Sequence, residues 1–455
     1  MKIVKQIRLL LKKSFDRIRN ERLKRNLLQA IPFWAASLLT GILAVLYAKL
    51  FAYAERETAY ILKHWGWILF IITPLCFIVA WWVVVRFSPY SRGSGIPQVM
   101  ASIELSSTAD EPKVSRLLSI RVIIVKMISS LVMALGGGVI GREGPTIQIA
   151  GSVFKKVYQW LPKWWPRISK QNMIMTGAAS GLAAAFNTPL GGIVFAVEEL
   201  TKTHISEFKT SLFTAVIIAG LTTQALLGPY LYLGYPNVNN SSNFIFFGVI
   251  AVAVVAGVSA SIMSKMMLAL LKWKSSFRLL YQHLLYITIA ALIIITCAFF
   301  IDHHMLGSGK DLMAHALFTQ DKYSAWYLPA LRIGGSILSF TVGAAGGVFA
   351  PALSAGASIG SAVSGWMHLS ESNANLLILS GMVGFLTGIT RTPFTSTILV
   401  VEMTDRHSVI LHLMLAGLVA SLASYLIDRH SFYDHLKGQY LDDVNQNEMR
   451  KNKQL

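Results

Sequence analysis

The sequence predicts an all-α integral membrane protein in which two similar halves combine helices of full and half length. Three observations lead to this fold class: the composition, the lengths of the apolar segments and an internal repeat. Of the 455 residues, 54% are hydrophobic and 14% are charged, and the mean hydropathy is +0.54. Because soluble domains carry about 25% charged residues, this composition excludes an ordinary soluble protein.

Apolar segments of about membrane-spanning length recur along the chain. A transmembrane helix needs about 20 apolar residues, and segments near that length cover residues 30–53, 66–87, 122–138, 212–227, 244–271, 284–301, 337–355 and 409–426. Shorter apolar pieces cover residues 96–105, 146–157, 173–186, 189–197, 376–389 and 394–401. Half-length helices tolerate membrane depth only where protein or a water-filled cavity covers their ends. The pattern therefore favours the interior of a transporter or channel over a simple helical bundle.

The chain contains an internal repeat. Residues 173–200 align without gaps on residues 377–404. The matched pairs include Gly177 with Gly381, Leu182 with Leu386, Pro189 with Pro393, and Glu198 with Glu402. A glycine-rich break precedes each copy, and such paired interruptions in two halves point to a transporter's binding site. The repeat by itself leaves open whether the two halves are parallel or inverted.

Three glycine–proline breaks carry the strongest functional signal. They lie at residues 93–97 (GSGIP), 141–145 (GREGP) and 346–351 (GGVFAP). Proline suits the first turn of a helix, glycine lets the backbone approach a ligand, and helix N-termini bind anions. Glu143, in the second break, is expected at membrane depth, where ionisable groups mark ion or proton paths. A carboxylate beside an anion-binding helix end predicts a gate, because it can occupy the anion's own place.

Taken together, the breaks, the repeat and the carboxylate resemble the CLC family of chloride channels and proton-coupled chloride transporters. The resemblance covers about residues 33–436. It implies two inverted halves with many tilted and half-length helices, which meet at an anion path near the membrane centre. It also implies a homodimer with one path per subunit, joined through the repeated segments. Chloride and protons would be the transported ions, with no cofactor, no metal and no enzymatic activity.

The resemblance also assigns site residues. Glu143 corresponds to the external gate and proton site, and chloride would be bound by Ser94, Gly95, Ile96, Arg142, Gly144, Val348, Phe349 and Tyr433. Hydroxyls and helix-start amides supply about half an elementary charge per helix end, which lets chloride bind and still leave. Three alternatives stay open: Ser94 as a turn or cap residue, Tyr433 as an interfacial aromatic and Arg142 as a structural part of its turn.

Two adjacent glutamates are predicted to differ in role. Glu198 has a repeat partner in Glu402, which indicates an architectural task such as capping or buried pairing. Glu199 has no acidic partner, since Met403 stands opposite. By resemblance, Glu199 matches the internal proton site of the family's exchangers, where channel members usually lack an acid. A solvated residue at a helix end beside Lys202 is the alternative. The predicted function is chloride–proton antiport, with a passive chloride channel of the same family as its rival.

Three other positions refine this prediction. Lys126 lies inside an apolar span and resembles a buried lysine of the family, with snorkelling to the interface as the alternative. Gln98 and Met100 stand where some exchangers carry acids, so a proton entry route that uses those acids is not supported. In the family, proline at the position of Ser94 accompanies nitrate preference and methionine accompanies fluoride export. Ser94 therefore predicts chloride over fluoride.

The net charge of +19 concentrates near the chain ends, and residues 1–25 carry ten Lys and Arg. We expect a basic cytoplasmic helix over residues 1–28, a transport domain over 29–436 with halves at about 29–229 and 243–436, and a short cytoplasmic tail over 437–455. Both termini would be cytoplasmic by the positive-inside tendency, and the short tail favours a bacterial inner membrane. Nucleic-acid binding is the disfavoured alternative for the basic segment.

An intramembrane hydrolase is the remaining rival. Ser94 and Ser180 both lie on glycine-rich turns, as some nucleophiles do. A serine nucleophile needs a base within hydrogen-bond reach, and the histidines show no paired catalytic pattern with either serine. The sequence therefore disfavours this class.

Overall fold

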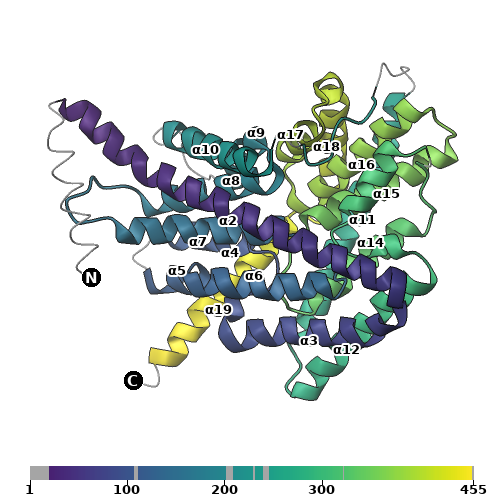
Figure 1. Cartoon of the computed structure of the whole chain (residues 1–455), viewed down its shortest axis with the longest axis horizontal. Helices are drawn as coiled ribbons and strands as arrows, with labels where there is room; N and C mark the ends of the chain where they lie inside the picture. Colours follow the sequence, from purple (N-terminus) through teal and green to yellow (C-terminus); the bar gives the residue numbers. More distant parts are fainter. Residues whose placement is uncertain are drawn as a thin grey trace.

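The computed structural model describes residues 20–106, 111–200, 209–228, 231–238, 245–320 and 322–452, and they form a helical membrane protein (Figure 1). The described helices are α2 (Glu21–Trp65), α3 (Leu69–Phe87), α4 (Ile96–Leu105), α5 (Glu111–Leu117), α6 (Ile120–Leu135), α7 (Glu143–Trp160), α8 (Lys170–Phe186), α9 (Pro189–Phe195), α10 (Lys209–Leu227), α11 (Ile245–Lys274), α12 (Leu280–Phe300), α13 (Lys310–Phe318), α14 (Leu328–Thr341), α15 (Phe349–Trp366), α16 (Glu371–Thr390), α17 (Pro393–Thr404), α18 (Ile410–Tyr425) and α19 (Phe432–Asn452). Short 3₁₀ segments join some of them, namely η1 (Gly66–Ile68), η2 (Pro89–Ser91), η5 (His303–Met305) and η6 (His407–Val409), and η3 (Ala196–Leu200) is a π-helical turn.

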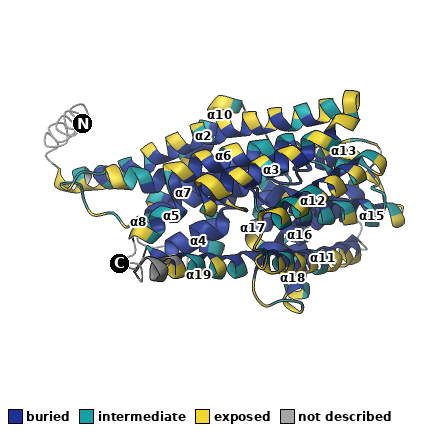
Figure 2. Ribbon diagram, turned by 90° about the horizontal axis from the view of Figure 1, so that it is seen from below, coloured by how far each residue is buried: buried dark blue, intermediate teal, exposed yellow. Residues whose placement is uncertain are grey.

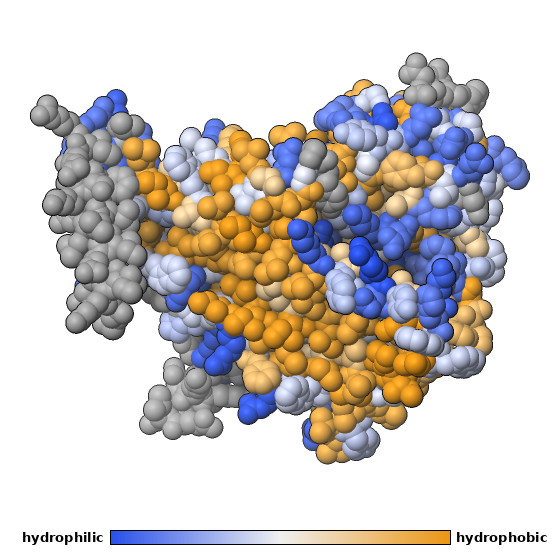
Figure 3. Space-filling view, in the orientation of Figure 1, coloured by the Kyte–Doolittle hydropathy of each residue, from blue (hydrophilic) through white to orange (hydrophobic). Residues whose placement is uncertain are grey.

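Seven helical segments among the described residues are long and apolar enough to cross a membrane. They are Lys24–Phe87, Pro112–Leu135, Lys209–Leu227, Ile245–Lys274, Leu280–Phe300, Glu371–Thr390 and His407–Tyr425. Hydrophobic residues cover the middle of the face on which α2, α3 and α6 lie, and hydrophilic residues gather toward its right-hand side (Figure 3). The chain is therefore a multi-pass membrane protein.

One predicted span is wrong. Residues 337–355 do not form a single helix, because α14 ends at Thr341 and α15 begins only at Phe349. Gly343 has a φ of +86°, a left-handed conformation that interrupts a helix and that glycine adopts without steric cost. The third glycine break thus separates two helices.

The half-length pieces are confirmed in part. α4 has the predicted bounds of residues 96–105, and α9 and α17 are short, at 7 and 12 residues. In contrast, α16 runs for 20 residues where a short piece over 376–389 was expected. This helix is long enough to cross the membrane, yet almost all of it is buried inside the protein (Figure 2).

The internal repeat folds as two copies of one unit. Asn187 follows the last residue of α8 and the equivalent Arg391 follows that of α16, and both cap residues are left-handed, with φ of 58° and 63°. Pro189 and Pro393 then open α9 and α17 at the first helical position, where proline needs no N–H partner. α8 packs on α7 and α16 packs on α15, while α9 and α17 contact each other.

The repeated segments expose few apolar side chains at the protein surface, although their sequences are apolar. All of Met173–Phe186 and nearly all of α16 are buried within the subunit. The large apolar side chains that the repeat exposes are Leu190 and Phe394, in the first turns of α9 and α17, and Val197 in η3, at 54%, 49% and 45% exposure. The exposed apolar surface of the repeat is therefore concentrated at these three positions.

The first turn of α2 and the last turn of α19 lie on the same side of the molecule, at the left of Figure 1. Residues 1–19 of the predicted basic helix lie outside the described residues, and residues 21–28 are the first turns of α2. α19 continues through the predicted boundary at residue 436, and its Tyr440 and Val444 are buried. The domain boundaries remain predictions, because some of them fall in or beside segments that the structure does not describe.

Candidate ion-binding site

The three glycine breaks meet at one place in the fold. The Gly93 N–H donates to the Ala344 carbonyl at 2.8 Å, which joins the first break to the third. Gly141 and Gly347 exchange two backbone hydrogen bonds of 2.8 and 2.7 Å, which join the second break to the third. Segments far apart in the sequence therefore hold the starts of α4, α7 and α15 together.

Two glycines leave no room for a side chain at this meeting point. A Cβ on Gly144 would lie 2.2 Å from Ser94 Oγ, and a Cβ on Gly141 would lie 2.2 Å from Glu143 Oε2. Gly95, which precedes α4, has a φ of +111°, in a region that side chains rarely adopt. The glycines thus bring Ser94 against the first turn of α7.

The backbone N–H groups at the three helix starts are not capped by the side chain of the N-cap residue. The N-cap residues are Gly95 for α4, Arg142 for α7 and Val348 for α15, and none caps its helix with a side-chain hydrogen bond among the described residues. The first N–H groups of a helix have no intrahelical acceptor and carry partial positive charge. Their convergence creates a positive potential without a full positive charge.

The carboxylate of Glu143 lies at two of these helix starts. Glu143 is completely buried, and its side chain lies near the backbone N–H of its own residue and that of Ala350, in the first turns of α7 and α15. A Cβ on Gly141 would touch both Glu143 Oε2 and the Ala350 side chain. The carboxylate therefore stands where helix ends favour a negative charge.

Buried hydroxyls complete the site. Neither oxygen of Glu143, nor Ser94 Oγ, nor the Tyr433 hydroxyl forms a hydrogen bond of normal geometry with a described residue. The Tyr433 hydroxyl faces Ser94, and both side chains are at most 1% exposed. A buried polar group without a partner costs about 1–3 kcal/mol, so such a cluster is suited to binding a ligand that supplies the missing interactions.

Aromatic packing and a helix cap position Tyr433. Its ring stacks on that of Phe349, with centroids 6.2 Å apart and planes at 14°. At the start of α19, Ser431 Oγ accepts from the Asp434 N–H at 3.0 Å and donates to the Asp434 carboxylate at 2.9 Å. The sequence-predicted residues Ser94, Ile96, Val348, Phe349 and Tyr433 are all buried, with exposures of at most 2%.

The Arg142 side chain ties the turn before α7 to α8. Its guanidinium donates to the Ala185 carbonyl near the end of α8, at 3.3 Å. This contact fits the structural interpretation of the side chain. The backbone N–H of Arg142 still belongs to the turn that opens α7.

Two buried lysines donate hydrogen bonds to backbone carbonyls in or beside the first and third breaks. Lys126 does not snorkel: it is fully buried, and its Nζ donates to the carbonyls of Ser91 and Gly93 at 3.0 and 2.7 Å. Lys274 Nζ makes the matching contacts beside the third break, with the carbonyls of Thr341 and Val342. Sequence reasoning missed Lys274, because a lysine at the end of an apolar span usually indicates an interfacial residue.

The Gln98 side chain also forms hydrogen bonds with the loop that precedes the first break. Its amide donates to the carbonyls of Tyr90 and Arg92, at 3.2 and 2.7 Å. Gln98 therefore stabilises the loop before the break, and its amide does not supply the carboxylate that some exchangers carry at this position.

Glu199 lies in the π-helical turn η3, and π-helical turns often occur at functional sites. Its charged neighbours include Asp434 and Lys437, in the first turns of the helix that carries Tyr433. The structure thus brings Glu199 close to α19. Lys202, the neighbour in the alternative interpretation, lies outside the described residues.

Glu198 and Glu402 are architectural, as predicted. The carboxylate of Glu198 accepts from the N–H groups of Phe394 and Thr395 at 3.2 and 2.6 Å, in the first turn of α17. The carboxylate of Glu402 accepts from those of Leu190 and Gly191 at 3.1 and 2.8 Å, in the first turn of α9.

A match to a protein-family model identifies the family. The family model described as "Voltage gated chloride channel" matches residues 75–425. The chain belongs to this family, the CLC proteins. Among its relatives is the H(+)/Cl(−) exchange transporter ClcA of Klebsiella pneumoniae, which is 26% identical over 92% of this chain and 92% of the relative.

Solved structures agree on the fold. A slow cyanobacterial Cl−/H+ antiporter superposes with a TM-score of 0.80 at 22% identity, over 92% of this chain and 99% of that one. A CLC-type fluoride/proton antiporter gives 0.74 at 20% identity, over 89% and 96%. The predicted all-α CLC fold with inverted repeats is therefore confirmed.

Proposed function

We propose that this CLC protein exchanges chloride for protons across a bacterial inner membrane. The observation that carries the proposal is the place of the Glu143 carboxylate, at the meeting of the α7 and α15 helix starts. A site that attracts one negative group at two helix ends also suits an anion from solution. The relative from Klebsiella pneumoniae is itself described as an H(+)/Cl(−) exchange transporter, which supports the same class of function.

Chloride would bind next to the carboxylate. The hydroxyls of Ser94 and Tyr433 are buried and have no partner of normal geometry among the described residues, so both can donate to an anion. Backbone amides would complete the shell, from Gly95, Ile96, Arg142, Gly144, Val348 and Phe349. Because these donors carry partial charges only, chloride would be held loosely enough to leave.

Glu143 would act as gate and outer proton site. While ionised, its carboxylate competes with chloride for the helix-start amides. Protonation removes that charge, so the side chain loses its attraction to the helix ends and chloride replaces it. Each protonation would thereby be linked to an exchange of anion.

Glu199 would be the inner proton site. Asp434 and Lys437, in the first turns of α19, are charged neighbours of Glu199, and this closeness to the helix of Tyr433 supports a second carboxylate beside the proposed path. The proton route would then diverge from the chloride route between the two carboxylates.

Reconstitution into liposomes tests the proposal directly. Purified full-length protein is incorporated with a chloride gradient, and chloride and proton fluxes are recorded together. Antiport requires that chloride leaving the liposomes drive protons in the opposite direction, against their gradient. Chloride flux with no linked proton movement would overturn antiport and favour the passive channel.

A further inference from the structure

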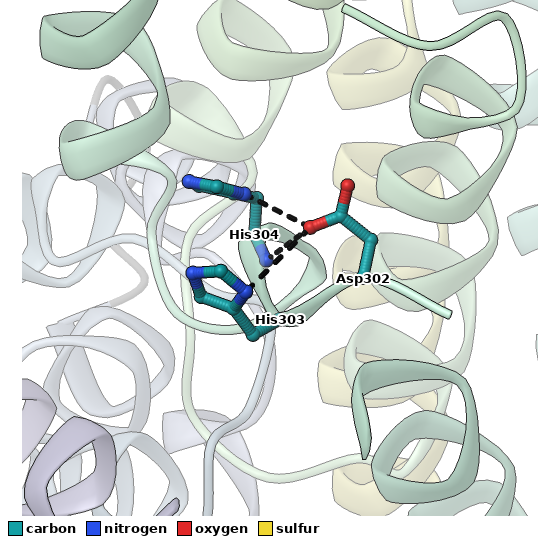
Figure 4. A group of neighbouring side chains, drawn as sticks. All are labelled: Asp302, His303 and His304. Carbon is teal, nitrogen blue, oxygen red and sulfur yellow. Dashed lines mark hydrogen bonds and ion pairs between the residues drawn. The ribbon is translucent and has the colours of Figure 1, made fainter. Parts of the chain in front are cut away.

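A group of imidazole side chains lies outside the ion-binding site, where α12 ends. Asp302, His303 and His304 are drawn in Figure 4, and their ligand atoms lie within 4.8 Å of one another. The Phe300 ring at the end of α12 contacts Trp67, so the group lies on the side of the molecule that α2 reaches with Trp65. The Asp302–His304 group is thus on the opposite side of the molecule from the start of α2.

Asp302 holds the His304 ring through Nδ1, which leaves Nε2 as the nitrogen that could bind a metal. Asp302 Oδ1 lies 2.9 Å from both the His304 N–H and His304 Nδ1. An ionised carboxylate only accepts hydrogen bonds, so Nδ1 carries the proton and Nε2 keeps its lone pair. A histidine that donates one ring N–H to a carboxylate and binds metal through the other nitrogen is a recurring arrangement.

Two further imidazoles flank the oriented one. The ring centroid of His303 lies 4.1 Å from that of His304, and the centroid of His315, in α13, lies 5.5 Å from it. The side chain of His303 is 68% exposed, and His315 is exposed as well. Both flanking side chains are therefore open to an ion from solution.

The backbone beneath the group is held in place. The buried guanidinium of Arg332 donates to the carbonyls of Met305 and Gly307 at 2.8 and 3.1 Å. Glu55 accepts from the Ser308 N–H at 2.7 Å. A loop fixed on both sides loses little freedom when a ligand binds, which lowers the entropic cost of binding.

We propose that His303, His304 and His315 bind one divalent transition-metal ion of the Zn²⁺ type, with Asp302 positioning His304. Imidazole nitrogen suits zinc, nickel, cobalt and copper, whereas magnesium and calcium require several oxygen ligands. Three histidines leave a fourth position of a tetrahedral zinc site for water. The site is separate from the proposed chloride path and does not depend on the proposed antiport.

Calorimetric titration of the full-length protein, purified without a histidine tag, tests the site. We expect one Zn²⁺ per chain and no binding of Mg²⁺ at the same concentration. Co²⁺ should bind at the same place and develop the visible absorption bands of a tetrahedral nitrogen-coordinated ion. Asp302→Asn should weaken Zn²⁺ binding by about 10- to 100-fold, the usual effect of removing the carboxylate partner of a ligating histidine.

Single substitutions decide which residues are ligands. His304→Ala should abolish binding, and His303→Ala, at an exposed side chain, should weaken it without affecting folding, which the unfolding temperature checks. His435→Ala is the matched control, because His435 Nε2 lies 3.2 Å from the Asp428 carboxylate in a similar pair elsewhere. Zn²⁺ binding that survives both His303→Ala and His304→Ala, or that disappears in His435→Ala, would overturn the proposal.

Discussion

Glu198 and Glu402 exchange helix caps between the two repeats. Each carboxylate accepts two backbone N–H groups from the first turn of the short helix that belongs to the other copy. The capped residues are themselves equivalent in the repeat, since Leu190 aligns with Phe394 and Gly191 with Thr395. This exchange joins α9 to α17 near the outer face of the subunit, and the ionised carboxylates also suit the positive helix ends.

Loss of either cap should destabilise the protein. Glu198→Gln and Glu402→Gln remove the charge and leave at most one good acceptor for two N–H groups, at a cost of about 1–3 kcal/mol each. We expect a lower unfolding temperature, followed by tryptophan fluorescence in detergent, and lower expression. Glu21→Gln is the control, because that side chain is 84% exposed. Equal unfolding temperatures for all three variants would contradict the capping role.

Glu143→Gln should separate chloride movement from proton movement. Glutamine cannot ionise, so it neither carries a proton nor competes as an anion for the helix starts of α7 and α15. Proton flux in liposomes should fall to background, while chloride flux persists and loses most of its dependence on pH. Proton transport that continued in this variant would remove Glu143 from the proposed route.

Glu199→Gln should stop protons and leave chloride movement largely intact. Ser94, Tyr433 and the helix-start amides, which would bind the anion, are unchanged by this substitution. The ratio of proton to chloride flux is the measurement, with Glu21→Gln as control, because that side chain is 84% exposed. An unaltered ratio in Glu199→Gln would refute the inner proton site and favour the channel.

Anion preference should follow Ser94. The unaltered protein should transport chloride in preference to fluoride, and Ser94→Pro should shift selectivity toward nitrate. Removing one hydrogen-bond donor from a bound anion is worth about 1.4 kcal/mol, or tenfold in relative affinity. Flux measurements with each anion test this, and fluoride transport as fast as chloride in the unaltered protein would be the contrary result.

The predicted homodimer should separate into active monomers when the exposed ends of the repeat are altered. Ile193→Trp combined with Ile398→Trp places bulky rings on the partly buried faces of α9 and α17, close to the exposed Leu190 and Phe394. Light scattering after size exclusion should report monomers, and liposomes should retain transport, since the proposed path lies within one chain. Folded monomers without any transport would argue against one path per subunit.

Local sequence patterns predict much of this architecture. Helix ends follow from residues whose backbone preferences are intrinsic: Pro189 and Pro393 open helices, and the glycines at 93–95 break them. The repeat aligns Glu198 with Glu402, and this pairing correctly predicts the architectural role that their hydrogen bonds show. A segment such as 337–355 was misjudged because hydropathy measures transfer to lipid and is insensitive to a single left-handed residue, Gly343.

The sequence by itself determined the membrane fold, the family and the candidate residues, because composition, periodicity and short motifs are local properties. Only the tertiary structure decided how they meet. Gly93 bonds to Ala344, and Gly141 bonds to Gly347, through backbone hydrogen bonds that no side-chain pattern encodes. Likewise, Lys274 clamps the third break and Glu143 reaches the start of α15, since both contacts depend on the packing of helices that are distant in the chain.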